Sequence, residues 1–433
     1  MTLLMTVIGI VVFVFGLLFS IAWHEAGHLA MGKLFGVRVP QYMVGFGKTL
    51  WSKKVGETEY GLKAIPAGGY CRLIGMFPPD DQGRVKAKST SPWRSMIEEA
   101  REASYEEVGP GDETRMFYTR KPWQKFLIML AGPAMNLVLG VAILSTVWMT
   151  YGTAQISNRV SSVSDCVIKA SEPERKCTDT DAPSPAKAAG LKAGDRIVEF
   201  NGIPVHDYDK LQPLIRKSSG QVTVVVDRNG QRVTLTPTLE QNQVAKLDKD
   251  GRPIPDQYLT TGFLGFSPDS ELITLGPGGV VKEMGSYIDK SIEGLTRIPQ
   301  KIPALWGAAF QGDKRDQDSP VGMVGAARIG GEVMAADVPV EARLVFAVQL
   351  LAMVNIGLFL FNMLPLLPLD GGHMVGALWE SLRRRVARMF RRPDPGPFDV
   401  AKLMPVAYAV AMVFIGFTVL VLIADLVNPV KVT

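Results

Sequence analysis

Histidine and cysteine are scarce in this chain of 433 residues, which contains four histidines and three cysteines. Three cysteines are too few for a domain held together by disulfides, and none of them forms a C-x-x-C metal-binding pair. Clusters of Lys and Arg interleaved with aromatic residues are also missing, and the net charge is only +5. These absences argue against a disulfide-rich scaffold, a cysteine-based metal site and a nucleic-acid-binding protein.

Charged residues are absent from four long apolar runs, although they make up 21% of the chain. The runs cover residues 3–23, 126–151, 344–369 and 403–424. Each run is long enough to cross a bilayer as a helix. No basic segment precedes the first run and no small-residue cleavage site follows it, so we interpret it as a membrane span and not as a signal peptide. The sequence therefore predicts an α-helical membrane protein with four transmembrane spans.

An H-E-x-x-H motif stands at the end of the first span, at residues 24–28. On a helix, His24 and His28 lie one turn apart on the same face, so both can bind one ion, and two imidazoles at this spacing suit zinc. Glu25 then lies beside the metal, where a carboxylate can take a proton from a bound water. Ionisable groups in a membrane span are costly and rarely without a function. We therefore interpret the motif as a zinc site and not as a chance match.

A catalytic zinc usually has three protein ligands and one position for water. The third apolar run offers two candidates for the remaining ligand, because Asp370 follows it directly and His373 comes three residues later. Asp370 is the better candidate, as a lone carboxylate at the end of a proline-broken span, and His373 is the rival. Ligand preference alone does not separate the two strongly. The prolines of this run predict that its later part is not regular helix. At membrane depth such backbone is tolerated only where it lines a site or is buried in protein.

Short alternating runs broken by glycines fill residues 33–75 and predict strands in hairpins. This segment includes Gly68, Gly69 and Tyr70. Two interpretations are open: an ordinary glycine-rich loop, or a small sheet beside the metal whose open edge binds an extended peptide by strand addition. The next segment, residues 76–122, is polar and mixed in charge, which predicts a solvated loop with some helix.

A polar region between the second and third spans contains A-G-L-x-x-G-D-x-I at residues 189–197. A helical pattern at 208–217 follows, and then two alternating strands at 222–226 and 233–239, joined by a hairpin turn at Asn229-Gly230. This region resembles a PDZ domain, a module that binds extended peptide ends. Cys166 and Cys177 lie just before the motif, and they can form a disulfide if the region is outside the cell.

Arginines gather between the third and fourth spans, at residues 383–392. We interpret this basic run as a topology signal that stays in the cytoplasm, in preference to a site for nucleic acid or anionic lipid. Four spans then place residues 33–122 inside and the PDZ-like region and both termini outside. The expected segments are a first span with the H-E-x-x-H motif (1–32), a β element (33–75), a cytoplasmic loop (76–122), a second span (123–151), an extracytoplasmic PDZ-like α+β domain (152–270), a membrane-surface region (271–343), a third transmembrane region (344–375), a basic cytoplasmic loop (376–402), and a fourth span with the C-terminus (403–433).

Two motifs in combination, H-E-x-x-H at 24–28 and N-x-x-P-x-x-x-L-D-G at 362–371, resemble the signatures of the site-2 protease family of intramembrane zinc metalloproteases. Within that family the chain is most similar to the actinobacterial regulated intramembrane proteases. The resemblance extends over nearly the whole chain, through G-F-G at 45–47, A-G-P-x-x-N at 131–136 and S-P-V-G at 319–322.

The resemblance implies a set of site residues. It assigns a Zn²⁺ ion to His24, His28 and Asp370, with Glu25 as the general base. It also implies that residues 33–75 form a membrane-re-entrant β element whose edge pairs with substrate. The substrate contacts expected from it are Asn362, Pro365, Gly68, Gly69 and Tyr70.

The activity implied by the resemblance is hydrolysis of peptide bonds inside the transmembrane segments of single-span membrane proteins, such as anti-sigma factors, in the bacterial plasma membrane. An upstream site-1 protease would make the first cut outside the cell, and the PDZ-like domain would exclude untrimmed substrates. One alternative is a membrane metal transporter, for which Glu25 and the PDZ-like region are unnecessary. Another is an inactive relative that only binds membrane proteins, and the complete set of expected catalytic residues argues against it.

Overall fold

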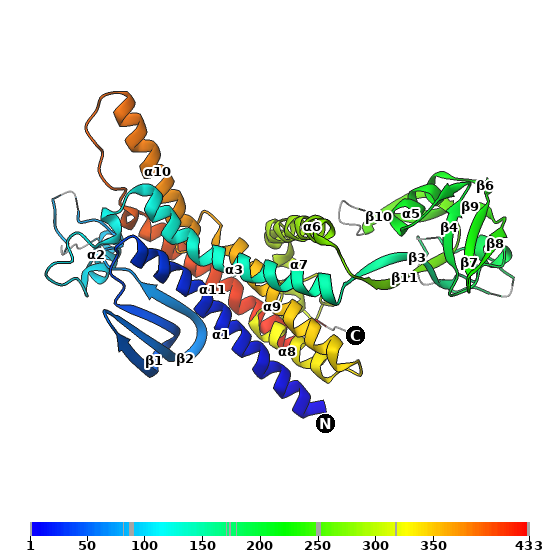
Figure 1. Cartoon of the computed structure of the whole chain (residues 1–433), viewed down its shortest axis with the longest axis horizontal. Coiled ribbons are helices and arrows are strands. Elements are labelled where there is room, and N and C mark those ends of the chain that lie inside the picture. Colours follow the sequence, from blue (N-terminus) through cyan, green and yellow to red (C-terminus); the bar gives the residue numbers. More distant parts are fainter. Residues whose placement is uncertain are drawn as a thin grey trace. The chain divides into compact units, whose positions relative to one another are not determined.

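Four long apolar helices dominate the computed structural model, which describes residues 2–80, 82–85, 91–169, 171–172, 175–178, 180–247, 253–316 and 318–430. Within these residues, four helices are long and apolar enough to cross a membrane: α1 (Thr2–Leu34), α3 (Pro122–Thr150), α9 (Val340–Asn362) and α11 (Met404–Val427). The four predicted spans are therefore confirmed as helices (Figure 1). The last three residues of the predicted 403–433 segment lie outside the described part of the chain.

The chain divides into two compact units. Residues 148–280 form one unit, and the segments before and after them form the other. We call the second of these the membrane unit, because it contains most of α3 and all of α1, α9 and α11. The two units are described separately below.

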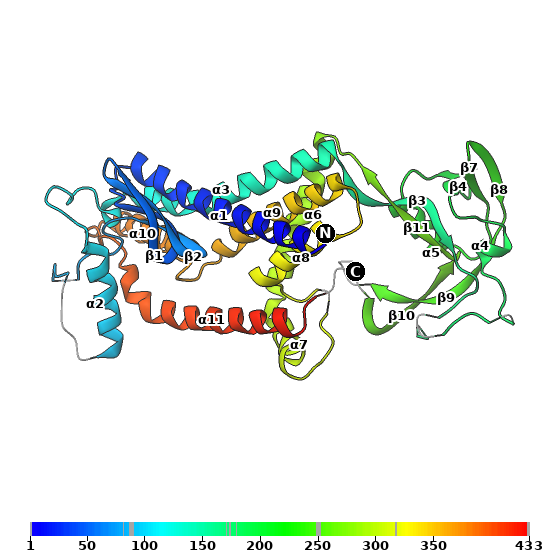
Figure 2. The same cartoon turned by 90° about the horizontal axis from the view of Figure 1, so that it is seen from below.

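Three further helices occupy residues 277–335, in the segment that the sequence assigned only to the membrane surface. They are α6 (Pro277–Thr296), α7 (Ile298–Phe310) and α8 (Met323–Ala335). Helix α8 packs along α1, as Figure 2 shows. Glycines make this close contact possible, because a Cβ atom on Gly331 would lie 2.9 Å from the Thr6 carbonyl oxygen. Gly331 is thus a point of close contact between α8 and α1.

A two-stranded element formed by β1 (Gln41–Val55) and β2 (Thr58–Arg72) follows α1. The predicted hairpin is confirmed. The first part of β1 pairs with two separate parts of β2, so that Met43 has both Gly61 and Tyr70 as partners. Residues 41–44 therefore lie between residues 59–62 and residues 69–72. Residues 69–72 have a pairing partner on one side only among the described residues, and this edge reaches the site described below.

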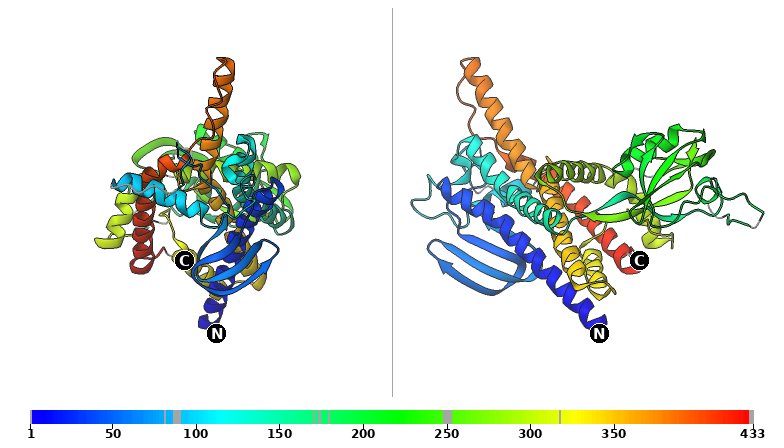
Figure 3. Two further views of the ribbon diagram at one scale, coloured as in Figure 1. Left: turned by 90° about the vertical axis from the view of Figure 1, so that its left-hand side faces the viewer. Right: turned by 45° about the vertical axis from the view of Figure 1, so that its right-hand side comes forward.

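The polar segments on either side of the spans are partly helical. Helix α2 (Pro92–Tyr105) and the short 3₁₀ turn η1 (Phe117–Thr119) lie within the predicted 76–122 loop. Helix α10 (Asp370–Met389) continues through the arginines at 383–385 and 388. The predicted basic loop at 376–402 is thus helical over its first half. Arginine favours helix, and the first proline of this segment is Pro393. A 3₁₀ turn η2 (Val400–Leu403) then leads into α11. Figure 3 shows the far end of α10 extending beyond the neighbouring helices.

The 148–280 unit is an α+β fold. Its main sheet has the order β11 (Phe266–Ile273), β3 (Thr153–Val163), β4 (Arg196–Phe200), β7 (Val224–Arg228), β8 (Gln231–Leu235), with β5 (Ile203–Pro204) beside β4. A second sheet contains β10 (Pro253–Phe263), β9 (Thr238–Leu247) and β6 (Gly220–Gln221). Helices α4 (Pro185–Ala188) and α5 (Tyr208–Lys217) complete the unit, whose core includes Ile197, Phe200 and Leu211.

Local predictions in this unit are confirmed in detail. Helix α5 has the predicted bounds, and the turn between β7 and β8 has positive φ angles of 55° at Asn229 and 84° at Gly230, as a tight hairpin requires. Cys166 and Cys177 are joined by a disulfide. The second predicted strand is divided, because Pro237 interrupts it between β8 and β9.

Candidate functional site

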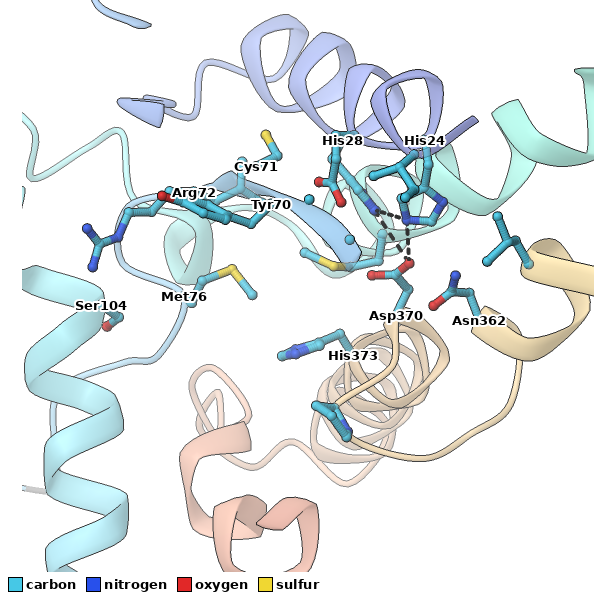
Figure 4. A pocket seen from close by; sticks show the side chains of 18 of the residues that line it. His24, His28, Tyr70, Cys71, Arg72, Met76, Ser104, Asn362, Asp370 and His373 are labelled. Carbon is cyan, nitrogen blue, oxygen red and sulfur yellow. Dashed lines mark hydrogen bonds and ion pairs between the residues drawn. The ribbon is translucent and has the colours of Figure 1, made fainter. Parts of the chain in front are cut away.

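Three side chains from distant parts of the chain meet in the membrane unit (Figure 4). His24 and His28 lie one turn apart on α1, and Asp370 is the first residue of α10. The Oδ2 atom of Asp370 lies 3.2 Å from His24 Nε2 and 3.5 Å from His28 Nε2, and the two Nε2 atoms are 3.2 Å apart. These three residues are the group that the structure brings within metal-binding range among the described His, Cys, Asp and Glu residues.

The geometry of this group fits a tetrahedral zinc ion. Ligand atoms at about 2.0–2.1 Å from zinc in a tetrahedron are about 3.3–3.4 Å from one another, close to the three observed separations. The hydrogen bonding points the same way. His28 Nδ1 lies 2.8 Å from the carbonyl oxygen of Ile128, so this nitrogen carries the proton and Nε2 offers a lone pair. The two Nε2 atoms and the Asp370 carboxylate then direct lone pairs at the same point. This arrangement is unfavourable unless a cation lies between them.

Asp370, and not His373, completes this group. The two residues lie three positions apart on α10, and both line the same cavity. Only the carboxylate has an oxygen within the metal-binding group. Residues 363–369 form the loop between α9 and α10, and α10 begins with Asp370 beside the two histidines. The prolines of this loop predicted the interruption. Ligand preference separated Asp370 from His373 only weakly, and the prediction of Asp370 rested on the sequence resemblance described above.

Helix α3 forms the wall behind the two histidines. A Cβ atom on Gly132 would lie 2.2 Å from His28 Nε2 and 2.8 Å from His24 Nε2, so only glycine leaves room for the imidazoles. Gly27 of α1 makes the reciprocal approach, because its Cβ would lie 2.4 Å from the Ala131 carbonyl oxygen. The A-G-P-x-x-N motif at 131–136 thus lies where α3 closely approaches α1.

Asn136 is a site residue whose role the sequence analysis missed. Its Nδ2 atom lies 3.4 Å from His24 Nδ1, and its Oδ1 atom is buried without a hydrogen-bond partner. When His24 binds a metal through Nε2, its Nδ1 carries a proton and needs an acceptor. Asn136 supplies that acceptor if its amide is turned over, and the unsatisfied oxygen is then paired. The available signal was a polar side chain in the middle of an apolar span.

The edge of β2 lies against Glu25. A Cβ atom on Gly69 would lie 3.2 Å from Glu25 Cγ and 2.9 Å from Ile21, so the absence of a side chain lets the strand approach α1. Gly68 has a φ of 139°, a conformation reserved for glycine, and its Cβ would collide with the Phe46 ring. Tyr70 stacks on Phe46 with a centroid distance of 6.3 Å. The two glycines thus allow the edge formed by residues 69–72 to approach the side of α1 that carries Glu25.

A cavity of about 600 Å³ connects these elements. It is lined by Glu25, the metal-binding group, Gly68, Gly69, Tyr70 and Asn362. Pro368 lines the cavity and Pro365 does not, although both prolines are exposed. Helix α2 closes one side through Ala100, Ala103 and Ser104, which the sequence analysis did not select.

Cys71 also lines the cavity, but its chemistry does not fit a ligand or nucleophile. Burial raises the pKa of its thiol far above the ordinary value, and the nearby Glu25 carboxylate raises it further. The Cys71 sulfur is also not part of the metal-binding group.

Comparison with known proteins gives a consistent result. The family model described as peptidase family M50 matches residues 12–392. The zinc metalloprotease Rip1 of Mycobacterium tuberculosis (strain ATCC 25618 / H37Rv) is 32% identical, with 99% of each chain covered. Rip1 of Mycolicibacterium smegmatis is also 32% identical, over 98% of each chain. A putative zinc metalloprotease of Mesorhizobium japonicum is 27% identical, over 87% of this chain and 90% of its own. The family model and both Rip1 matches include the two segments that supply the metal-binding group.

Proposed function

Because the chain belongs to peptidase family M50, the site-2 proteases, and is a zinc-dependent protease of the membrane, we propose that it cleaves single-span membrane proteins within their transmembrane segments. The observation that carries the proposal is the position of the metal-binding group. His24 and His28 lie on a helix that can cross the membrane, and Asp370 follows another such helix after a short loop. A peptide bond cut there lies at membrane depth.

The proposed roles of the site residues rest on the contacts described above. His24, His28 and Asp370 hold the zinc ion, which when bound polarises a water molecule and the scissile carbonyl. Glu25 lies against Gly69 at the cavity wall, where its carboxylate takes a proton from water and passes it to the leaving amine. Ile128 and Asn136 hold the two imidazoles in the orientation that presents Nε2.

A substrate must be extended at the bond that is cut, because a helix hides its carbonyl groups in internal hydrogen bonds. Within the described part of the chain, residues 69–72 pair with a strand on one side only and line the cavity, so an unwound segment can add to this edge as a further strand. Asn362 lines the cavity at the end of α9 and is the proposed side-chain contact to the substrate backbone. In this proposal Gly68 and Gly69 keep the edge accessible and Tyr70 lies beside the bound strand.

The test of this function is cleavage of a single-span substrate by the purified chain and its Glu25→Gln variant. Zinc content is measured on both proteins. The amide retains the size of the carboxylate and is not a proposed metal ligand, so we expect zinc to be retained and cleavage to be lost by at least about 10²-fold. Equal cleavage by both proteins would remove Glu25 from the mechanism. A substrate cut outside its apolar segment would remove the intramembrane assignment.

The natural substrates and the arrangement in the membrane are further parts of the proposal. We take the substrates to be anti-sigma factors or similar proteins already trimmed outside the cell by a site-1 protease. The 148–280 unit is then an extracytoplasmic PDZ-like domain, and the arginines of α10 are cytoplasmic. The α+β fold of this unit and its disulfide support that placement, because disulfides persist in oxidising compartments.

The proposed role of the PDZ-like domain is to exclude substrates with large outer domains. Ser164 N donates a hydrogen bond to Gly265 O over 2.9 Å, so residues 165–264 can be replaced by a short Gly-Ser linker without breaking the β3–β11 ladder. We expect the shortened protein to cleave both trimmed and untrimmed substrates, and the full chain to cleave only trimmed ones. If both proteins reject the untrimmed substrate, the domain does not act as a gate.

A further inference from the structure

Helix α10 has an apolar face that nothing in the described part of the chain covers. Val375, Leu378, Leu382, Val386 and Met389 follow one another at spacings of three and four residues, so they lie on one side of the helix. Their exposed fractions are 47%, 54%, 52%, 41% and 70%. Trp379 and Phe390 widen the same face and are 51% and 63% exposed. We call these seven residues the α10 apolar face.

The opposite side of α10 is attached to the protein at its beginning. Met374, Gly376, Ala377 and Glu380 are buried, and Glu380 accepts hydrogen bonds from Lys125 of α3 and from the Phe398 amide. The apolar face therefore points away from the helices of the membrane unit. It runs from membrane depth, near Asp370, to the far end of α10, over a length of about 22 Å.

Unpaired arginines border this face at its far end. Arg385, Arg388, Arg391 and Arg392 are exposed and form no ion pair with the described residues, in contrast to Arg384, which pairs with Glu380 and Asp394. The only acidic residues of α10 are Asp370 and Glu380, and both are engaged. The end of α10 is thus a basic amphipathic surface on which these four arginines have no counterion among the described residues.

We propose that this surface binds the anionic phospholipids of the bilayer in which the protein lies. The apolar face enters the acyl region, and the four unpaired arginines bind lipid phosphates at the headgroup level. Charge complementarity and continuity with the membrane both favour lipid as the occupant. A topology signal needs positive charge alone, whereas here the charge is combined with a continuous apolar face on the same helix. The helix carrying this surface begins at Asp370, so the lipid also holds the element that carries one residue of the metal-binding group.

The experiment uses the full chain reconstituted in phosphatidylcholine vesicles that contain a minority of phosphatidylglycerol. Either lipid is supplied with brominated acyl chains, which quench tryptophan fluorescence on contact. The contribution of Trp379 is the difference between the protein and its Trp379→Phe variant. Trp306 on α7, which is 53% exposed, gives the reference through Trp306→Phe. We expect brominated phosphatidylglycerol to quench Trp379 several-fold more than its mole fraction predicts, and to quench Trp306 without such preference.

A variant with four substitutions distinguishes the effect of the α10 arginines from the effect of the protein's net charge. Replacing Arg385, Arg388, Arg391 and Arg392 by Gln should abolish the phosphatidylglycerol preference at Trp379, since each arginine contributes up to about fivefold to the local enrichment. The matched control removes the same charge from exposed side chains of the 148–280 unit: Lys176, Lys217, Arg232 and Lys246, each replaced by Gln. That control should keep the preference, and added salt should weaken it in both control and parent.

Three results would overturn the proposal. Absence of quenching at Trp379 by either brominated lipid would mean that protein covers the apolar face. Equal quenching by both lipids would mean that the arginines do not select anionic headgroups. Loss of the preference in the control variant would assign it to net charge and not to α10. Zinc content, measured on every variant, verifies that the metal-binding group is intact, and the readout does not depend on proteolysis.

Discussion

Replacing Gly132 by Ala tests whether α3 shapes the metal site. The added Cβ would lie 2.2 Å from His28 Nε2, 2.7 Å from His28 Cε1 and 2.8 Å from His24 Nε2. Ordinary contacts of a Cβ begin at 3.4 Å, so the closest nitrogen must retreat by 3.4 − 2.2 = 1.2 Å. Zinc–ligand distances vary by only about 0.2 Å. The variant therefore cannot keep both imidazoles in place on the same ion.

The expected loss follows from this displacement. Disturbing only the outer partners of a metal ligand already lowers affinity by about 10–100-fold, and here the ligands themselves move. We expect zinc affinity to fall by at least about 100-fold. If α1 and α3 separate instead, Glu25 moves relative to the metal, and a displacement of about 1 Å lowers catalysis by about 10²-fold. Either response removes most of the proteolytic activity.

The measurement is zinc retained against a chelator of graded concentration, together with cleavage of the single-span substrate. Gly357→Ala and Gly416→Ala are matched controls, because both glycines lie in membrane helices and an added Cβ meets nothing within 4 Å. Both controls should bind zinc as the parent does. The reasoning would be refuted by a folded Gly132→Ala protein with the zinc affinity and activity of the parent.

Three further predictions concern the ligands, their supports and the second unit. Asp370→Ala should lose zinc and His373→Ala should retain it when metal content is measured; the reverse result would exchange the two assignments. Asn136→Ala should lower zinc affinity by about 10–100-fold in the same chelator titration, while Asn136→Asp, which keeps an acceptor for His24, should lose less. Burial raises the pKa of Asp195, but its hydrogen bonds with Arg228 and the Lys192 amide outweigh burial and hold the pKa below the ordinary value. Asp195 thus stabilises the 148–280 unit above the pKa of the unfolded carboxyl, about 3.9, and this contribution is lost as the pH falls through the lower folded-state pKa. Amide hydrogen exchange of the full chain should show Asp195→Asn destabilising this unit by about 1–3 kcal/mol at neutral pH, without that acid-dependent loss; unchanged exchange would contradict the role of the Asp195–Arg228 pair.

The parts of the fold that depend on local signals were predictable from the sequence. The four spans follow from uncharged runs of sufficient length, and the turn at Asn229-Gly230 follows from two residues that tolerate positive φ. The end of α9 at Asn362 follows from the prolines after it. In each case the determining residues are adjacent in the chain.

The parts that depend on contacts between distant residues were missed or left open. Residues 271–343 were expected only to lie at the membrane surface, whereas Gly331 lies inside α8 and allows its close contact with Thr6 of α1. The S-P-V-G motif gave no hint that the Gly322 and Gly325 amides donate to the buried carboxylate of Asp425 on α11. The choice between Asp370 and His373 likewise depends on where α10 begins relative to α1, which residue types alone do not specify.

The three residues of the metal-binding group are far apart in the chain, so they are synthesised at different times. His24 and His28 leave the ribosome almost at the start, whereas Asp370 leaves it only after the 148–280 unit and α9 have been made. A nascent chain that has inserted its first spans thus carries two histidines, Glu25 and the edge of residues 69–72, but not the complete metal-binding group. Metal capture is a late step of biogenesis, and a truncated chain that ends before α10 remains proteolytically silent in the membrane.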